Sequence, residues 1–252
     1  LTGKFLFNTD SAIDLPTVGD FVYAQLFDDD TLAIIQDILP RKSLLKRKAA
    51  GKKIDYQLIA ANIDIAIIMQ GLDSNFNIRR LERYLVIIND NNITPLILLS
   101  KSDLISPEET EEKKKQILQI LPDAKIFSFS NNNLSDIENI KTIFTPHKTY
   151  CLLGSSGVGK TTLLNNLIHQ DLYKTQPIRE KDDRGKHTTT RRELIILENG
   201  AIIIDNPGMR ELGIISNESG ISSTFGEIDE LSDQCKYKDC THTVEAGCAV
   251  LE

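Results

Sequence analysis

The hydrophobic pattern of this chain changes character near residue 58. Before it, short β-rich runs (GKFLF, DFVYAQLF and TLAIIQDIL) are separated by turn residues such as NTDS and LPTVGD. After it, continuous apolar runs of buried-strand length, at 62–69 and 94–100, alternate with segments whose apolar residues recur at helical spacing. This order predicts a small β-rich domain followed by an α/β domain with a mostly parallel sheet.

Further elements of the α/β region can be predicted one by one. NIRRLERYLVIINDNN has apolar residues at helical spacing, and PEETEEKKKQILQIL begins with proline and acids and becomes basic later, as helices do. AKIFSFS is typical of a strand and LSDIENIKTIF of a helix. TYCLLG predicts another strand, and RELIILENGAIIIDNPG predicts two strands joined by a turn at Asn199-Gly200.

A phosphate-binding loop follows the strand TYCLLG. Residues 154–161, GSSGVGKT, match G-x-x-x-x-G-K-[ST] with a predicted strand before and a helix after, which is the context this motif requires. Its glycines let backbone N–H groups surround phosphates, and the helix start adds a favourable dipole. The residues predicted to bind nucleotide here are Gly154, Ser155, Ser156, Gly157, Val158, Gly159, Lys160, Thr161 and Thr162.

The remaining phosphate and metal contacts are predicted downstream. Lys160 should reach the β- and γ-phosphates, and Thr161 should ligate Mg²⁺. AIIIDNPG places Asp205 at the end of a strand, 45 residues after Lys160, where it can hold Mg²⁺, and the Gly208 N–H can meet the γ-phosphate. GKHTTTRR lies between the two motifs and is interpreted as a switch segment whose Thr189 hydroxyl reaches Mg²⁺ and the γ-phosphate.

The predicted base-reading residues precede the phosphate loop. In LLSKSDLI, residues 100–103 (Ser100, Lys101, Ser102 and Asp103) follow a buried strand, where the carboxylate of Asp103 can accept hydrogen bonds from guanine N1–H and its amino group. The Lys101 stem should stack on the base. The FSFSNNN stretch, taken from Ser128 to residue 132, ends the next predicted strand and could give a backbone N–H to the guanine oxygen. Because the reader comes first, we expect a circularly permuted GTPase domain.

Composition and cysteine placement narrow the class of protein. The net charge of −7 gives no global attraction to nucleic acid, and no apolar run approaches the roughly 20 residues of a membrane helix. We therefore expect no membrane contact. Four cysteines in a small secreted chain would indicate two disulfides, but a nucleotide enzyme of this size is expected to be cytoplasmic, where thiols stay reduced and clustered cysteines indicate metal. Cys151 is interpreted as a buried core thiol. Cys235, Cys240, His242 and Cys248 lie within 14 residues and predict a tetrahedral structural zinc site, since no ligand position is left open.

A basic segment, residues 41–53, stands out in this acidic chain. RKSLLKRKAAGKK holds seven basic residues in thirteen. One interpretation is a solvated linker, and the other is a contact with a nucleic-acid phosphate backbone. The candidates for RNA binding are Arg41, Lys42, Lys46, Arg47, Lys48, Lys52 and Lys53.

These motifs, in this order, resemble the ribosome-small-subunit-dependent GTPase A family (RsgA, also called YjeQ or EngC). The resemblance covers essentially the whole chain and rests on IAANIDIAIIM, SKSDL, GSSGVGKTTLLNNL, GKHTTTRRE, DNPGMRELG and the cysteine cluster. It implies an OB-fold that binds RNA at 1–50, the permuted GTPase domain at 51–215 and a zinc module at 216–252. It further implies a monomer that binds the small ribosomal subunit and its rRNA, with Mg²⁺ and GTP or GDP and one zinc ion, and assists late subunit maturation.

The chain departs from that family at Ser100, where asparagine is usual, so bracing of the phosphate loop or base should be weaker. Asn206 replaces the commoner threonine or serine. We also expect the first strand or strands of the OB-fold and the end of the C-terminal module to lie outside the given sequence.

Catalysis is predicted to need help from a partner. Met209 stands where many GTPases have a glutamine that orients the attacking water, and it cannot do so. His187 is the nearest candidate replacement, with Lys160 and Thr189 completing the catalytic set. Two other classes remain open. These are a P-loop ATPase or kinase, which would not need residues 100–103, and an RNA-binding assembly factor with a nearly inactive GTPase site.

Overall fold

The computed structural model describes residues 11–29, 31–48, 56–168, 193–205, 231–232, 234–237, 240 and 247–251. Its first elements, in chain order, are η1 (Ala12–Asp14), β1 (Val22–Phe27), β2 (Leu32–Ile38), β3 (Leu44–Lys48) and β4 (Tyr56–Ala61). The α/β part contains β5 (Ile65–Gly71), α2 (Ile78–Asp90), β6 (Thr94–Ser100), η2 (Ser102–Leu104), α3 (Pro107–Ile120), β7 (Ile126–Ser128), α4 (Leu134–Lys141), β8 (Thr149–Gly154), α5 (Lys160–Ile168), β9 (Glu193–Ile196) and β10 (Ile202–Asp205).

The central sheet has six strands in the order β7-β6-β5-β8-β10-β9. All neighbouring pairs are parallel except β10 with β9, which form an antiparallel hairpin at the turn predicted around Gly200. The chain builds outward from β5 to β6 and β7, then returns to place β8 on the other side of β5. The phosphate loop therefore begins on a central strand that is only the fourth of the sheet in sequence, as a permuted domain requires.

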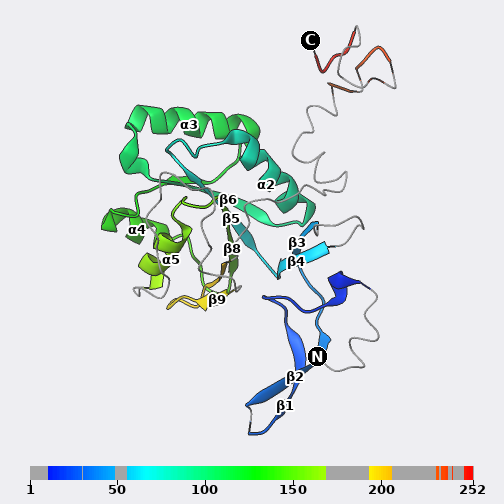
Figure 1. The fold of residues 1–252 in the computed structure, drawn as a ribbon. Helices are drawn as coiled ribbons and strands as arrows, with labels where there is room; N and C mark the ends of the chain where they lie inside the picture. The colour runs from blue at the N-terminus through cyan, green and yellow to red at the C-terminus, as the bar shows by residue number, and fades with distance from the viewer. Residues whose placement is uncertain are drawn as a thin grey trace, which may run out of the picture.

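Helices cover both faces of this sheet, with α2 and α3 on one side and α4 and α5 on the other (Figure 1). The strands are buried on both faces, which explains their uninterrupted apolar sequences. On β5, Ala66 and Ile68 pack into the core beneath α2, whereas Ile67 and Met69 pack into the core beneath α5. The alternation along one strand thus divides the interior into two cores.

The helix ends agree with their sequence signals. Asn77 caps α2, accepting a hydrogen bond from the Arg80 N–H at 2.9 Å. At α3, Ser106 and Glu109 form a reciprocal capping box, and Pro107 takes the first helical position. These contacts place the loops that precede each helix, which matters because those loops lie at the carboxyl edge of the sheet.

The β-rich start of the chain forms two hairpins, β1–β2 and β3–β4, and β1–β2 extends away from the central sheet (Figure 1). The structure describes no closed barrel in this region. The strands predicted in DFVYAQLF and TLAIIQDIL are confirmed, and GKFLF lies outside the described residues. Because β3 pairs with β4 across the boundary expected near residue 50, residues 44–48 are a strand and not a linker.

Asn62 joins the β-rich start to the α/β domain. It is buried with a left-handed backbone (φ 55°), and its side chain accepts from the Lys42 N–H at 2.9 Å and donates to the Gly19 carbonyl at 2.9 Å. The buried Ser43 hydroxyl adds a bond to the Ile63 carbonyl at 2.8 Å. The strand that enters the nucleotide domain is therefore fixed at its start by contacts with residues 19, 42 and 43.

Candidate nucleotide site

The phosphate loop, residues 154–161, connects the end of β8 to the start of α5. Gly157 and Gly159 have φ values of 72° and 97°, which favour glycine. A side chain at Gly154 would place its Cβ 2.7 Å from the Met69 carbonyl oxygen, so only glycine fits beside β5. The Lys160 ammonium folds back over the loop and donates to the carbonyls of Gly154 and Ser155 at 2.7 and 2.8 Å. The loop thus has the glycine conformations, the helix start and the central cation of a phosphate cradle.

The loop lies at the point in the sheet where the strand order reverses. From β5 the chain proceeds to β6 on one side, and β8 is followed in the sheet by β10 on the other. Loops that leave adjacent strands in opposite directions create a crevice at their carboxyl ends, which is where open α/β sheets bind ligands. The residues after β5 and after β8 share this edge.

Ser100, on the neighbouring part of the sheet, contacts the phosphate loop. It ends β6, is fully buried, and its hydroxyl lies 2.6 Å from the Val158 carbonyl and 3.3 Å from the Gln70 carbonyl. The shorter side chain thus contacts the phosphate loop directly, and its weaker bracing relative to asparagine stays a prediction. The hydroxyl has one proton, so the shorter distance to Val158 marks its main acceptor.

The predicted base-reading residues form a turn after β6. Lys101 has a left-handed backbone (φ 62°), and Asp103 lies in η2 with its carboxylate exposed at the edge of the sheet. Hydrogen bonds from the Ser130 side chain lower the pKa of Asp103 below its ordinary value, with further contributions from the Asn132 side chain and the Lys101 charge that outweigh desolvation. An ionised carboxylate fixed in this way can only accept hydrogen bonds, as recognition of the guanine N–H pair needs.

The loop after β7 begins within the stretch 128–132 that was predicted to approach the base. Ser128 belongs to β7 and pairs with Leu99, whereas Ser130 and Asn132 lie beside Asp103. The two loops are joined through the backbone, since the Ser102 N–H donates to the Phe129 carbonyl at 3.2 Å. The Asn131 side-chain amide instead donates to the Gly159 carbonyl of the phosphate loop at 3.3 Å. Ser130 and Asn132 are thus the residues of the predicted stretch that accompany the base reader.

Asp205 ends β10, where it is buried and pairs with Leu152 on the parallel strand β8. Two residues further along β8 the phosphate loop begins, so Asp205 and Thr161 belong to the same edge of the sheet. Both offer oxygen atoms, which suit Mg²⁺. Gly208, Thr189, His187 and Met209 lie outside the described residues.

Asp73 and Asn75 were missed by the sequence reasoning. They follow β5 as Asp103 follows β6, and the signal that could have found them is the polar DSNFN directly after a buried strand. The Lys101 ammonium forms an ion pair with Asp73 at 2.6 Å. Burial raises the pKa of Asp73, but the hydrogen bond from Lys101 together with backbone hydrogen bonds gives a net lowering.

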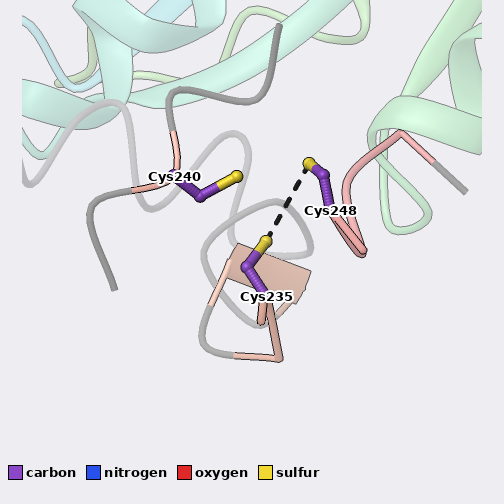
Figure 2. Close-up of side chains that lie close together, drawn as sticks. All are labelled: Cys235, Cys240 and Cys248. Carbon is purple, nitrogen blue, oxygen red and sulfur yellow. Dashed lines mark hydrogen bonds between the residues drawn. The ribbon is translucent and has the colours of Figure 1, made fainter. Parts of the chain in front are cut away.

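Three cysteines converge near the C-terminal end of the sequence. The thiols of Cys235, Cys240 and Cys248 lie within 4.8 Å of one another, with Cys235 and Cys248 3.9 Å apart (Figure 2). That separation excludes a disulfide, whose sulfurs lie about 2.05 Å apart. A zinc tetrahedron with Zn–S bonds of about 2.3 Å requires sulfurs about 3.8 Å apart, so the cluster fits three ligands of a zinc ion. His242, the predicted fourth ligand, lies outside the described residues.

The basic segment divides into residues with different surroundings. Arg41 contacts Asp20 at 2.7 and 2.8 Å and also donates to the Ile13 and Leu15 carbonyls, so its guanidinium stabilises the fold. Lys42 is exposed, and the Lys46 ammonium lies 4.6 Å from the centre of the Tyr56 ring. Arg47 and Lys48 belong to β3. Lys52 and Lys53 lie outside the described residues.

Two further expectations concern the core and the membrane. Cys151 is fully buried within β8, as expected of a core thiol. No helix in the described part of the chain has both the length and the apolar character that crossing a membrane requires.

Comparisons with known proteins show the family of this chain. The family model described as "RsgA GTPase" matches residues 38–215. Small ribosomal subunit biogenesis GTPase RsgA 2 of Listeria monocytogenes is 43% identical over 240 residues, which are 95% of this chain and 67% of that protein. Small ribosomal subunit biogenesis GTPase RsgA of Methanosarcina acetivorans is 41% identical over 238 residues, 94% of this chain and 64% of that protein.

Two solved structures have a fold similar to that of this chain. The crystal structure of YloQ, described as a circularly permuted GTPase, is 26% identical with a TM-score of 0.62, covering 97% of this chain and 75% of that one. The structure of YjeQ from Thermotoga maritima is similar in fold, with 24% identity, a TM-score of 0.65, and coverage of 99% and 80%. With a phosphate loop on β8, a base reader upstream on β6 and a family model spanning most of its length, this chain belongs to the RsgA family of circularly permuted GTPases.

Proposed function

We propose that this chain binds GTP at the carboxyl edge of its sheet, hydrolyses it to GDP and phosphate, and does so in the biogenesis of the small ribosomal subunit. The observation that carries the nucleotide assignment is the meeting of two separate sequence segments. The phosphate loop after β8 is braced by Ser100, the first residue of the base-reading segment 100–103. A hydrogen bond therefore links the proposed phosphate-binding segment to the proposed base-reading segment, so that one nucleotide could contact both.

Each side chain has a task that follows from its chemistry. The Lys160 ammonium would leave its two carbonyl partners for the β- and γ-phosphates, because phosphate oxygens carry more charge. Asp103 would accept the guanine N1–H and amino group, while Lys101 would lie along the base. Thr161, Thr189 and Asp205 would hold magnesium, which when bound neutralises charge on the phosphates. The Gly208 N–H would donate to the γ-phosphate.

The proposed reaction needs a water aligned with the γ-phosphorus. Met209 has no polar atom that could orient it by hydrogen bonding, so hydrolysis by the free protein should be slow. We assign the missing role to His187 or to a group of the ribosomal partner, brought to the γ-phosphate when the segment 187–190 contacts the subunit. A hundredfold stimulation corresponds to about 2.7 kcal/mol of transition-state stabilisation, which one positioned group can supply.

Two other parts of the chain would serve partner binding. The proposed zinc ion, held by Cys235, Cys240, Cys248 and His242, would be structural and would provide much of the folding energy of a segment poor in apolar residues. Lys42, Lys46, Arg47, Lys48, Lys52 and Lys53 would contact rRNA phosphates, and Arg41 would not. The chain spans about two thirds of the length of the relatives it matches, which are themselves described as subunit biogenesis GTPases.

The test is steady-state GTP hydrolysis with small ribosomal subunits, with large subunits and with neither, for the wild type and for His187→Ala. Small subunits should raise the wild-type rate substantially and large subunits should not. His187→Ala should lose most of the stimulated rate and keep its GTP affinity, because the contact forms mainly in the transition state. Equal wild-type rates in all three conditions would reject the ribosomal role, and a fully stimulated variant would remove His187 from the mechanism.

A further inference from the structure

We infer that Asn75 is a positioning residue that holds the phosphate loop in its nucleotide-binding shape. Residues 72–77, here called the brace loop, contain Asn75 and connect the phosphate loop to the base-reading segment. The inference rests on the proposed nucleotide site. It concerns residues that connect β5 to α2 and carry none of the motifs of a phosphate or base contact.

Asn75 contacts two consecutive residues of the phosphate loop. The Ser155 hydroxyl donates to Asn75 Oδ1 at 2.8 Å, and Asn75 Nδ2 donates to the Ser156 carbonyl at 3.3 Å. In a planar trans peptide the carbonyl and the following N–H point in opposite directions. Holding the Ser156 carbonyl toward Asn75 therefore turns the Gly157 N–H away from Asn75, and N–H groups of this loop are what a phosphate binds.

The Asn75 side chain is itself held in one orientation. Arg80, in the first turn of α2, donates to Asn75 Oδ1 at 2.6 Å and to the Asn75 carbonyl. A guanidinium can only donate, so the oxygen of the amide must face Arg80 and the nitrogen is left for Ser156. The Asn75 N–H donates to Asp73 Oδ1 at 3.1 Å, which fixes the backbone of the same residue.

The brace loop is anchored at both ends. The buried Gln70 side chain donates to the Asn77 carbonyl at 3.0 Å and accepts from the Asn77 N–H at 3.1 Å. At the other end, Asp73 forms its ion pair with Lys101, the residue expected to stack on the base. A Cβ at Gly71 would lie 2.5 Å from Asp73 Oδ1, so glycine there lets the carboxylate sit against the strand end. One short loop thus contacts both halves of the site.

The decisive variant is Asn75→Ala, which removes both contacts to the phosphate loop. The loop would then occupy other conformations, and nucleotide binding would have to select the competent one, which lowers apparent affinity. We expect the Kd for GDP and for GTP to rise about tenfold. Affinity for guanosine, which meets only the base-reading segment, and the preference for GDP over ADP should stay unchanged, because Asp103 is not a partner of Asn75. A general loss of fold would weaken all ligands together.

The matched control is Ser74→Ala, an exposed neighbour in the same loop, which should bind GDP like the wild type. Arg80→Lys keeps the charge, but its ammonium ends one bond short of the guanidinium nitrogen that makes both contacts with Asn75, so it should weaken GDP binding in the same direction by a smaller factor. Combined with Asn75→Ala it should add little, because Arg80 acts through Asn75.

Wild-type GDP affinity in folded Asn75→Ala would overturn the inference. If that variant does not fold, Asn75→Asp decides, since it keeps the acceptor for Ser155 and Arg80 and loses the donor to Ser156. Unchanged GDP affinity in both Asn75→Asp and Arg80→Lys would then overturn it. Failure of the wild type to bind any guanine nucleotide would instead reject the proposed function.

Discussion

Ser100 offers a direct measure of how much the sheet contributes to nucleotide binding. Its hydroxyl is fully buried and lies 2.6 Å from the Val158 carbonyl. Ser100→Ala deletes this donor and otherwise leaves a side chain of the same shape, so the lost hydrogen bond dominates the change.

The magnitude follows from the burial of the contact. A net intramolecular hydrogen bond contributes about 1 kcal/mol, and a buried acceptor that loses its donor costs about 1–3 kcal/mol. We take about 1–2 kcal/mol, since a carbonyl oxygen has a second lone pair. If the whole of this free energy is lost from the loop conformation that binds nucleotide, the Kd for GDP rises about fivefold to thirtyfold.

The assay compares Ser100→Ala with Ser43→Ala by calorimetric GDP titration and thermal unfolding. Ser43 is also buried and also donates to a backbone carbonyl, that of Ile63 at 2.8 Å, but it lies in the joint around Asn62. Both variants should lose similar stability, and only Ser100→Ala should lose GDP affinity. A Ser100→Ala protein with lowered melting temperature and wild-type GDP affinity would refute the claim that this contact preorganises the phosphate loop.

Three further predictions concern the site and the cysteine cluster. Asp103→Asn should lose GTP and GDP and gain xanthosine nucleotides, whose C2 carbonyl pairs with an amide donor; competition binding that shows unchanged GDP affinity would remove Asp103 as the base reader. Lys160→Ala should abolish GTP turnover while the melting temperature stays near that of the wild type, because its ammonium contacts loop carbonyls and not the core; turnover at the wild-type rate would make the phosphate loop a false match. Chelation or Cys240→Ser should make residues 216–252 sensitive to protease while GDP binding persists, and zinc-free protein purified without chelator would contradict the metal assignment.

Most elements of the α/β domain could be predicted because their signals are local. The apolar run 94–100 coincides with β6, and Pro107 with its acidic neighbours marks the start of α3. Which strands lie next to each other in the sheet is not indicated by any local signal. Nothing in the composition of TYCLLG distinguishes a central strand from an outer one, so the position of β8 between β5 and β10 emerges only from the structure.

The site was predicted where a residue's role depends on its own chemistry, and missed where it depends on a distant partner. Asp103 follows a strand and could be singled out, but which residues of the stretch 128–132 lie beside it is decided by where β7 ends. Arg41 belonged to a basic run, and only the fold brings Asp20 to it. Asn75 lies 80 residues from Ser155 in sequence, so its amide had no visible partner.

The strand order also sets the sequence in which the sheet can be completed during synthesis. β5, β6 and β7 are all made before β8, yet β8 occupies the centre and hydrogen-bonds to β5 on one side and β10 on the other. Until β8 arrives, the nascent sheet has an open, apolar edge at β5, the kind of edge that recruits other strands. Closing it requires β8 to find a strand made some 85 residues earlier, where the Asp64 N–H donates to the Thr149 carbonyl and the Thr149 N–H donates to the Asp64 carboxylate, both at 2.9 Å. Such distant pairing slows folding. β8 therefore both covers the open edge of β5 and brings the phosphate loop, so that a chain released before β8 is made would carry a base reader without a phosphate site.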